Sequence, residues 1–410
     1  MKSGVPGFRG PYLTEAIECR GLSSASLADL LGISRSAVSH YETGLHTPSP
    51  EVFEKICKTL NLPPSFFTRP SFPVSQEVVF FRSMNPAMKV PQRKALRRLE
   101  WLQAITGYVR AYVELHDLDF PKFSSFKDPI EISDSEIESC ALRLRAAWGI
   151  GSGPVGNLVR ILENNGFIVA YDDFDSTMDG VSCFDDEGIP FIIVSRSSWA
   201  AQAREDLAYA LGHLILHRYV EKSRFGINRD FAILRRQAFR FAAAFLMPEE
   251  SFCLDVYAHT LDALRLQKAK WKVPIGLMVR RLQDLDLIDA EQAKKLWINR
   301  SRRGWRTEEP LDHDIPKEEC RLLAESIKLM VDESAQSKSE LLYALPLSDR
   351  DIETLTGLPT GYISDSMPVV SIIPPEKRTA PSRSNSGDKG QLISFPTRNA
   401  PTKEKRRKIN

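Results

Sequence analysis

Three observations predict a mostly helical α+β fold for this chain of 410 residues. Apolar residues recur at helical spacing through most of the chain, which is the pattern of amphipathic helices packed on a core. Short apolar runs at 167–171, 179–184 and 190–194 are typical of buried strands. The composition, 42% hydrophobic and 26% charged, is ordinary for a globular protein. We therefore expect a small sheet among many helices.

The predicted elements divide the chain into five parts. A bundle of short helices is followed by a Pro-rich linker that holds one strand around Val78–Phe81. A long amphipathic helix over 93–117 opens the third part. Other helices are predicted at 137–148, 155–164, 199–219 and 231–247, around the three strands. The expected boundaries are 11–67 for the bundle, 68–92 for the linker, 93–310 for the α+β part, 311–366 for a helical C-terminal segment and 367–410 for a tail.

The tail is set apart by its composition. From Met367 onward Pro, Ser, Asn and Lys dominate and the hydrophobic periodicity ends, which predicts a disordered segment. Ten Lys and Arg stand against three Asp and Glu, a net charge of +7. A cationic tail adds nonspecific attraction to phosphates. A solubilising or partner-binding role fits the same composition.

The hydropathy, the cysteine pattern and the net charge exclude several classes of protein. No apolar run is long enough for a membrane-spanning helix, and the N-terminus lacks the apolar core of a secretion signal. The six Cys are scattered without a C-x-x-C pair, which favours reduced, buried thiols in a cytoplasmic protein. The formal net charge of +2 is too small to imply nucleic-acid binding. Any such function must come from a local motif.

One segment of the bundle has the spacing of a helix-turn-helix. Apolar residues from Leu27 to Leu31 give the first helix a buried face, and Gly32 permits the left-handed conformation that ends it. Ser34 is placed to cap the second helix. In such motifs the second helix lies in the major groove of DNA. Its outward residues, the predicted DNA contacts, are Arg35, Ser36, Ser39 and His40; Arg35 suits a bidentate guanine contact.

Residues 11–67 resemble the Cro/CI-type (XRE) repressor family. The match rests on Leu-Ala, Gly-Ile-Ser, Ser-x-x-Ser-x-Tyr-Glu, Gly and Pro-Ser-Pro, which all fall in register between Leu27 and Pro50. The resemblance implies binding to double-stranded DNA, and readers of this kind usually bind as homodimers on two half-sites. The family usually has Gln at Ser24, so Ser24 is a predicted DNA-facing residue without a carried-over base contact. Reuse of the bundle for dimerisation or protein binding is the alternative.

A second motif lies in the 206–217 segment, which has the frame of a metalloprotease helix. In H-E-x-x-H, two His one turn apart bind zinc and the Glu between them is the general base. Here Tyr209 stands at the first His position, Ala210 at the Glu position, and only His213 remains. Tyr209 is a poor base at neutral pH because its ordinary pKa is near 10.

The region from about 75 to 365 resembles the ImmA/IrrE-type metallopeptidase family, in the subgroup that carries an N-terminal Cro/CI-type domain. The stretches that carry the match are Phe80-Phe-Arg82, Arg145-Ala-Ala-Trp-Gly-Ile150, Asn157 to Glu163, Asp179-Gly180, Leu211 to His217, Phe241 to Pro248 and Arg302 to Trp305. The resemblance implies a zincin-like α+β domain. The resemblance also implies that active relatives have a third zinc ligand, a Glu upstream of the stretch that corresponds to Phe241–Pro248.

In that upstream area this chain has Arg235, Arg236 and Gln237 and no carboxylate. Tyr209, Ala210, His213 and Gln237 are therefore interpreted as degenerate active-site positions, with no catalytic residue and no cofactor. The two Arg are expected to bring positive charge to the zinc position. A zinc-bound form would need His217 and an acid such as Glu205 or Asp206. Otherwise His217 is expected to be an ordinary helix-end residue near the C-terminal dipole.

Three functions follow from these motifs. The first is a sequence-specific transcriptional regulator whose degenerate zincin domain is a sensor or interaction module, with a protein partner or peptide at the former active-site cleft. The second is a zinc-dependent metallo-endopeptidase that cleaves a repressor or partner. The third, which only the family resemblance implies, is a DNA-binding component of a toxin–antitoxin or phage-defence locus.

Overall fold

The computed structural model describes residues 4–69, 78–81, 89–174, 178–225 and 227–364, and the statements below concern these residues. All of them belong to one compact unit that ends at Pro368. The predicted tail at 367–410 and most of the predicted linker lie outside the described residues. None of the described helices is long and apolar enough to cross a membrane.

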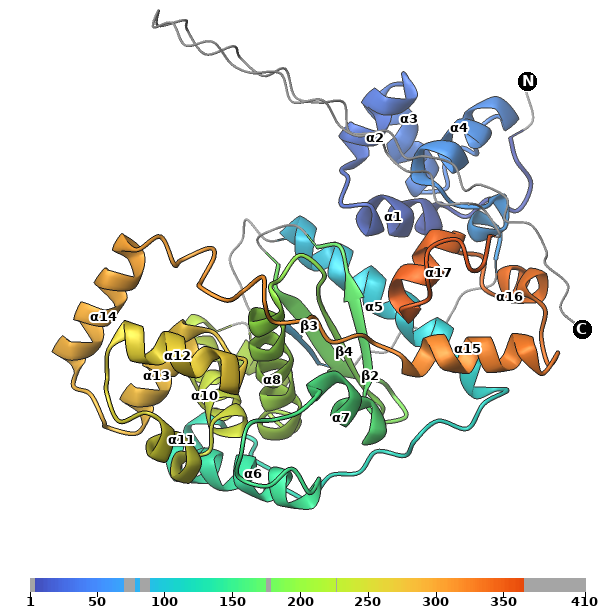
Figure 1. Cartoon of the computed structure of the whole chain (residues 1–410). Helices are drawn as coiled ribbons and strands as arrows, with labels where there is room; N and C mark the ends of the chain where they lie inside the picture. The colour runs from blue at the N-terminus through green and yellow to red at the C-terminus, as the bar shows by residue number, and fades with distance from the viewer. Residues whose placement is uncertain (1–3, 70–77, 82–88, 175–177, 226, 365–410) are drawn as a thin grey trace, which may run out of the picture. The chain divides into compact units, whose positions relative to one another are not determined.

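The N-terminal bundle has the predicted helix-turn-helix geometry (Figure 1). The Ser34 hydroxyl accepts a hydrogen bond from the Ala37 backbone N–H, and Gly32 has a φ of 66°, so both the predicted cap and the predicted turn are confirmed. The first helix of the motif packs on its neighbours through buried Leu27 and Ala28. The elements of the bundle are α1 (Gly10–Cys19), α2 (Ser24–Leu31), α3 (Arg35–Glu42), α4 (Pro50–Leu60) and the short η1 (Pro64–Phe67).

Four strands form the sheet, in the order β1-β3-β4-β2. They are β1 (Val79–Phe81), β2 (Ile168–Asp172), β3 (Gly180–Phe184) and β4 (Pro190–Ser195), and each lies where the sequence predicts a strand. The central β4 pairs parallel to β2 and antiparallel to β3, and β3 pairs antiparallel to β1. The mostly helical α+β class is therefore confirmed.

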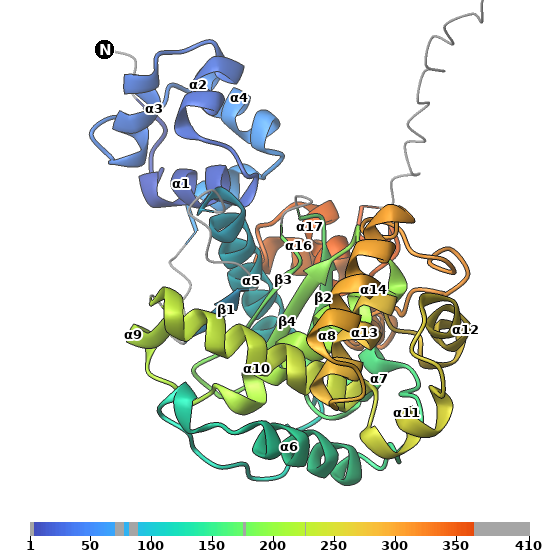
Figure 2. The same cartoon turned by 90° about the vertical axis from the view of Figure 1, so that its left-hand side faces the viewer.

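Helices cover both faces of the sheet (Figure 2). On one face lies α8 (Ala200–Leu216), which packs on α10 (Asn228–Leu246). Gly212 of α8 permits this close approach, because a Cβ there would lie 3.1 Å from the Ala238 carbonyl oxygen. On the other face lies α5 (Lys89–Arg110), which also contacts α1 of the bundle. The α5 helix thus packs on the bundle and on the sheet.

The α5 helix ends earlier than the sequence predicts. The apolar stripe predicts a helix to residue 117, but the helix ends at Arg110. Beyond buried Val109 the chain packs less closely: Val113 lies against the core only partly buried, and Tyr112 is 46% exposed. The backbone N–H groups of Tyr112 and Val113 both bond to the Val109 carbonyl. A helix gains less stability where its apolar face is less buried, which favours the early end.

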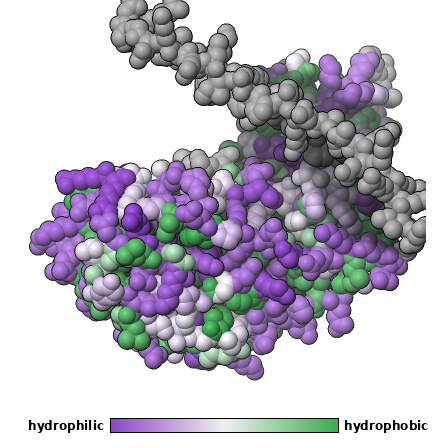
Figure 3. Space-filling model, in the orientation of Figure 1, coloured by the Kyte–Doolittle hydropathy of each residue, from purple (hydrophilic) through white to green (hydrophobic). Residues whose placement is uncertain are grey.

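The remaining helices pack beside those that cover the two faces of the sheet. Beside α8 and α10 lie η3 (Pro129–Glu131), α6 (Asp134–Ala147), α7 (Leu158–Asn164), α9 (Lys222–Phe225), α11 (Glu249–Asp255), α12 (Leu261–Trp271), α13 (Ile275–Asp284) and α14 (Ala290–Arg302). The C-terminal segment supplies α15 (Leu322–Asp332), α16 (Lys338–Ala344) and α17 (Asp349–Thr356). One apolar core lies on the α8 side of the sheet; a second joins the bundle, α5 and the C-terminal helices. On the face drawn in Figure 3, apolar residues form small separate patches.

Candidate functional site

The predicted DNA-reading face lies on α3. Arg35, Ser36 and Ser39 are exposed, and His40 is half-buried. The Arg35 guanidinium makes one loose ion pair, 3.9 Å from the Asp29 carboxylate, and its side chain is 74% exposed. Such an exposed pair contributes little to stability, so Arg35 is free to change partner. The exposed side chains of this face are therefore accessible to a polar ligand.

Two further predicted residues lie beside this face. Ser24 is half-buried in the first turn of α2, where backbone N–H groups and the helix dipole favour a phosphate. The His40 ring meets the His46 ring edge to face, with centroids 5.2 Å apart. This contact fixes the His40 ring against the loop that follows α3. The structure thus brings Arg35, Ser36 and Ser39 onto one exposed helix surface, with His40 at its margin.

The position expected for zinc lies on α8 and is buried. We call His213, His217 and Gln237 the histidine cluster. The Nδ1 atoms of His213 and His217 are 2.8 Å apart, and His217 Nε2 is 3.1 Å from the Gln237 Oε1 atom. Gln237 Nε2 donates to the carbonyl oxygens of Pro129 and Ile132, at 2.7 and 3.0 Å. All three side chains are at least 98% buried.

These contacts determine which ring nitrogens carry hydrogen. Carbonyl oxygens only accept, so the Gln237 amide must direct its oxygen to His217, and His217 Nε2 must donate. A neutral His217 then accepts at Nδ1, so His213 donates from its own Nδ1. His213 Nε2 is left with a lone pair, and it has no hydrogen-bond partner among the described residues. That atom is the one a zinc ion would bind.

Both imidazoles are held neutral. Burial lowers the pKa of His217 to about 3, although the hydrogen bond to Gln237 opposes the shift. Burial, followed by the nearby His217, lowers the pKa of His213 well below its ordinary value. His217 lies at the C-terminal end of α8, the helix-end position that the sequence predicts, and its imidazole is fully buried. The low-dielectric core outweighs the helix dipole.

The cleft expected beside His213 is filled by the chain itself. Phe80 of β1 stacks on the His213 ring, with centroids 5.1 Å apart and planes 15° apart. A chamber of about 10 Å³ remains, lined by residues that include Tyr209, Ala210, His213 and Asp206. That volume suits at most one water molecule. Directly beside His213 the described residues therefore leave no open cleft, because β1 pairs with β3 and Phe80 fills the space.

The positive charge expected at this place is also absent from it. Arg236 bonds to Asp134 at 2.8 Å and is half-exposed, while Arg235 lies over the Phe239 ring. Of the three upstream residues, Gln237 is the one whose side chain bonds to a histidine, and that histidine is His217 rather than His213. In a helix, consecutive residues point in different directions, so only one of the three can face α8.

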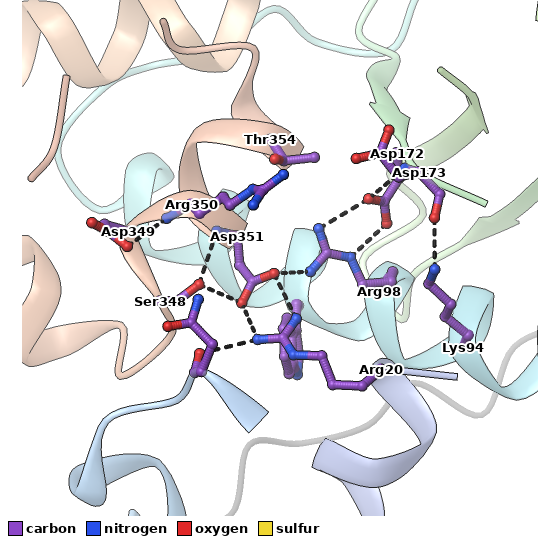
Figure 4. A network of polar contacts seen from close by, with 12 residues as sticks. Arg20, Lys94, Arg98, Asp172, Asp173, Ser348, Asp349, Arg350, Asp351 and Thr354 are labelled. Carbon is purple, nitrogen blue, oxygen red and sulfur yellow. Dashed lines mark hydrogen bonds and ion pairs between the residues drawn. The ribbon is translucent and has the colours of Figure 1, made fainter. Parts of the chain in front are cut away.

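A second buried polar group connects the bundle to the rest of the unit (Figure 4). We call Arg20, Arg98, Asp172 and Asp351 the arginine–aspartate network. Asp351 on α17 accepts from Arg20 at the end of α1 (2.8 Å) and from Arg98 on α5 (2.5 Å). Arg98 also donates to Asp172 at the end of β2, at 2.5 Å. Four elements distant in sequence therefore meet at paired charges.

Paired charges keep Asp351 ionised despite burial. Burial alone would raise the pKa of Asp351, but the hydrogen bond from Arg20 and the positive charges of Arg98 and Arg20 outweigh it. The pKa of Asp351 is lowered to about 2. Arg20 also donates to the carbonyl oxygens of Leu60 and Asn61, which ties the end of α4 to the same network.

Sequence reasoning missed these residues for identifiable reasons. Nothing in the sequence pairs Arg20 with Asp351, which lie 331 residues apart. The Phe80 stretch contributes to a family resemblance, but periodicity places no strand against a particular helix. A Phe in a short strand beside a Pro-rich linker is the only indication that the sequence offers.

The described structure is therefore a helix-turn-helix bundle joined to a mostly helical α+β domain. Two family models match accordingly. Residues 15–67 match the model described as Helix-turn-helix, and residues 162–283 match the Peptidase M78 model, described as an IrrE N-terminal-like domain. The chain thus joins a helix-turn-helix domain of the XRE type to an ImmA/IrrE-like domain. No curated protein matches the chain.

Proposed function

We propose that this chain is a sequence-specific, DNA-binding transcriptional regulator whose IrrE-like domain has lost peptidase activity and serves as a sensor or protein-interaction module. The observation that carries the proposal is the state of His213. Its Nε2 lone pair is buried, its Nδ1 is committed to His217, and its ring is covered by Phe80. The former site is part of the core.

The donors around His213 do not fit a catalytic zinc. Such a site needs three protein ligands and an open position for water. The described residues contain no group of three His, Cys, Asp or Glu side chains placed to hold a metal ion. Asp206 lines the chamber, but it accepts a hydrogen bond from Gln202 at 2.9 Å. Ala210 has no group to accept a proton from water, so the position of the missing Glu supplies no general base.

DNA reading would rest on α3. Arg35 donates to a guanine edge in the major groove, and Ser36 and Ser39 make shorter contacts to bases or phosphates. His40 and Ser24 contact the DNA backbone beside them. A homodimer would place two such helices on half-sites about one helical turn apart. Tail residues 367–410 would add phosphate attraction that does not depend on sequence.

The test compares binding to a selected DNA site with binding to random DNA. The operator is first selected from a random pool with the full-length protein, and affinities are then measured at several salt concentrations. We expect a preference for the selected site of about a thousandfold or more. Equal affinities for selected and random DNA at moderate salt would contradict the proposal. Chelator-sensitive cleavage of a partner would instead support the metallo-endopeptidase.

A further inference from the structure

We infer that the edge of β3 is a peptide-binding site, which β1 of the same chain occupies. When a partner protein binds, an extended segment of the partner that carries an aromatic residue displaces β1. The inference rests on the proposed function, since it states what the interaction module recognises and how the chain regulates access to it. Three observations support it: the backbone pairing of β1, the contacts of Phe80, and the small space left around His213.

The backbone of β1 is paired as a bound peptide would be. It lies antiparallel to β3, with Val79 opposite Cys183 and Phe81 opposite Val181. Among the described residues it is the last strand on its side of the sheet, so the β3 edge has no other occupant there. Adding an extended segment to the edge of a sheet is a general mode of peptide recognition. A segment of similar length can therefore replace β1 at β3.

The side chain of Phe80 gives this edge its specificity. Phe80 is 4% exposed and lies between the stacked His213 ring and the Phe225 ring, whose centroid is 5.3 Å away. Its neighbours Val79 and Phe81 face the α5 side and are only half-buried. The edge thus has one closed socket for an aromatic ring. The neutral state of His213 suits it, because an uncharged imidazole stacks without the desolvation penalty of a charge.

The socket holds one aromatic side chain at a time. With Phe80 in place, only the chamber of about 10 Å³ remains beside His213. A partner residue must therefore expel Phe80 before it enters. The strand lies in sequence between η1, which ends the bundle, and α5, which starts at Lys89. Exchange at β3 thus acts on the connection between the two domains, and it changes DNA affinity only if DNA binds the two forms differently.

A cross-strand disulfide tests this directly. Val79→Cys places a thiol opposite the buried Cys183, on the same face of the sheet. Oxidation then locks β1 on β3, and dithiothreitol releases it. Val79→Ser, treated with the same oxidant, is the matched control. The probe is a synthetic peptide with the sequence of residues 76–83, carrying a fluorinated Phe and followed by fluorine NMR. A second peptide has Asp in place of Phe80.

The peptide concentration at half-saturation depends on competition between the peptide and β1. A tethered strand competes at an effective concentration on the order of millimolar, so the reduced Val79→Cys protein and the Val79→Ser control should be half-saturated only near that concentration. Phe80→Ala in the protein removes the internal competitor's side chain and should lower the half-saturating concentration at least tenfold. The oxidised Val79→Cys protein should not bind, and reduction should restore binding. The Asp peptide should bind none of these proteins.

Three results would overturn the inference. The first is equal binding of the peptide to the locked and reduced proteins, which would place the peptide elsewhere, such as on the outer edge of β1. The second is a failure of the Phe80→Ala protein to bind the peptide. The third is a failure of oxidation to join the introduced thiol at position 79 to Cys183. These measurements use neither DNA nor metal, so their failure is separable from a failure of the proposed function.

Discussion

The exposed face of α3 and the buried histidine cluster of α8 have opposite relations to solvent. Arg35 is 74% exposed and loosely paired, whereas His213 and His217 are sealed in a core and bonded to each other. A binding surface needs polar groups that can exchange water for a ligand; the histidine cluster has exchanged water for contacts within the chain. The difference supports the proposal that the chain kept its DNA-reading half and turned its catalytic half into structure.

The arginine–aspartate network lies between these regions and differs from both. Arg98, Asp172 and Asp351 are buried like the histidine cluster, yet they and half-buried Arg20 form ion pairs. Each charge has opposite-charge partners at hydrogen-bonding distance, which is the condition under which buried charges persist. In the histidine cluster the two rings bond to each other and to the neutral Gln237 amide. Pairing, rather than burial alone, decides which cluster stays ionised.

The largest effect expected is the loss of stability in acid caused by the histidine cluster. The unfolded chain binds a proton at each His near pH 6.5, whereas the folded chain does so at His217 only near pH 3. Stability is therefore full above pH 6.5 and falls by roughly 1.4 kcal/mol per pH unit per His as the pH drops below it. Urea unfolding between pH 7 and pH 4 measures this. In His213→Leu the slope should be about half as steep; an unchanged slope would mean that His213 does not titrate on unfolding.

Asp351→Asn should have the next largest effect, because it removes the carboxylate that pairs with both buried Arg98 and half-buried Arg20. We expect a loss of about 3 kcal/mol in the free energy of unfolding. Asp349→Asn, two residues away and outside the network, should change it by less than about 0.5 kcal/mol. Equal effects of the two substitutions would mean that the network does not stabilise the packing of the bundle on the rest of the protein.

The contribution of Asp351 is lost in a more acidic pH range than that of the histidines. Its folded pKa of about 2 is below the ordinary 3.8, so its contribution is present above pH 3.8 and is lost as the pH falls toward 2. The contribution is roughly 2 kcal/mol. Comparing wild type with Asp351→Asn in this acidic range should show the difference in unfolding free energy between the two proteins shrinking. A constant difference would contradict the charge assignment.

On the DNA-reading side, Arg35→Ala should weaken binding to the selected site by about 1–3 kcal/mol, roughly tenfold or more. Binding to random DNA should change much less. Lys58→Ala is the matched control: it removes the same charge from α4, where Lys58 pairs with Glu54 at 2.7 Å. If both substitutions weakened binding equally, Arg35 would be acting only as a charge.

The smallest effect expected is that of removing residues 367–410. Their net charge of +7 predicts a uniform loss of affinity across DNA sequences and a shallower dependence on salt. The logarithm of affinity is plotted against the logarithm of salt concentration for both proteins. An identical slope for the two proteins would mean that the tail does not contribute to DNA binding.

Local elements could be predicted well from the sequence, and long-range contacts poorly. Gly32 and Ser34 indicate the turn and cap between α2 and α3, because both depend on a few neighbouring residues. The strands follow from short apolar runs. By contrast, the early end of α5, the pairing of Arg20 with Asp351 and the placement of Phe80 on His213 depend on residues far apart in the chain. Residue types at Tyr209 and Ala210 predict the loss of one zinc ligand and of the general base, but not which side chain fills the space beside His213.

The most direct test of the central claim is the zinc content of the purified, tag-free chain, measured by elemental mass spectrometry after incubation with zinc and removal of the unbound metal. His213→Leu is the matched variant. We expect near-zero zinc in both proteins, because His213 Nε2 lacks companion ligands among the described residues and lies beneath Phe80. About one zinc per chain in the wild type, lost in His213→Leu, would contradict the account and support a working metallopeptidase.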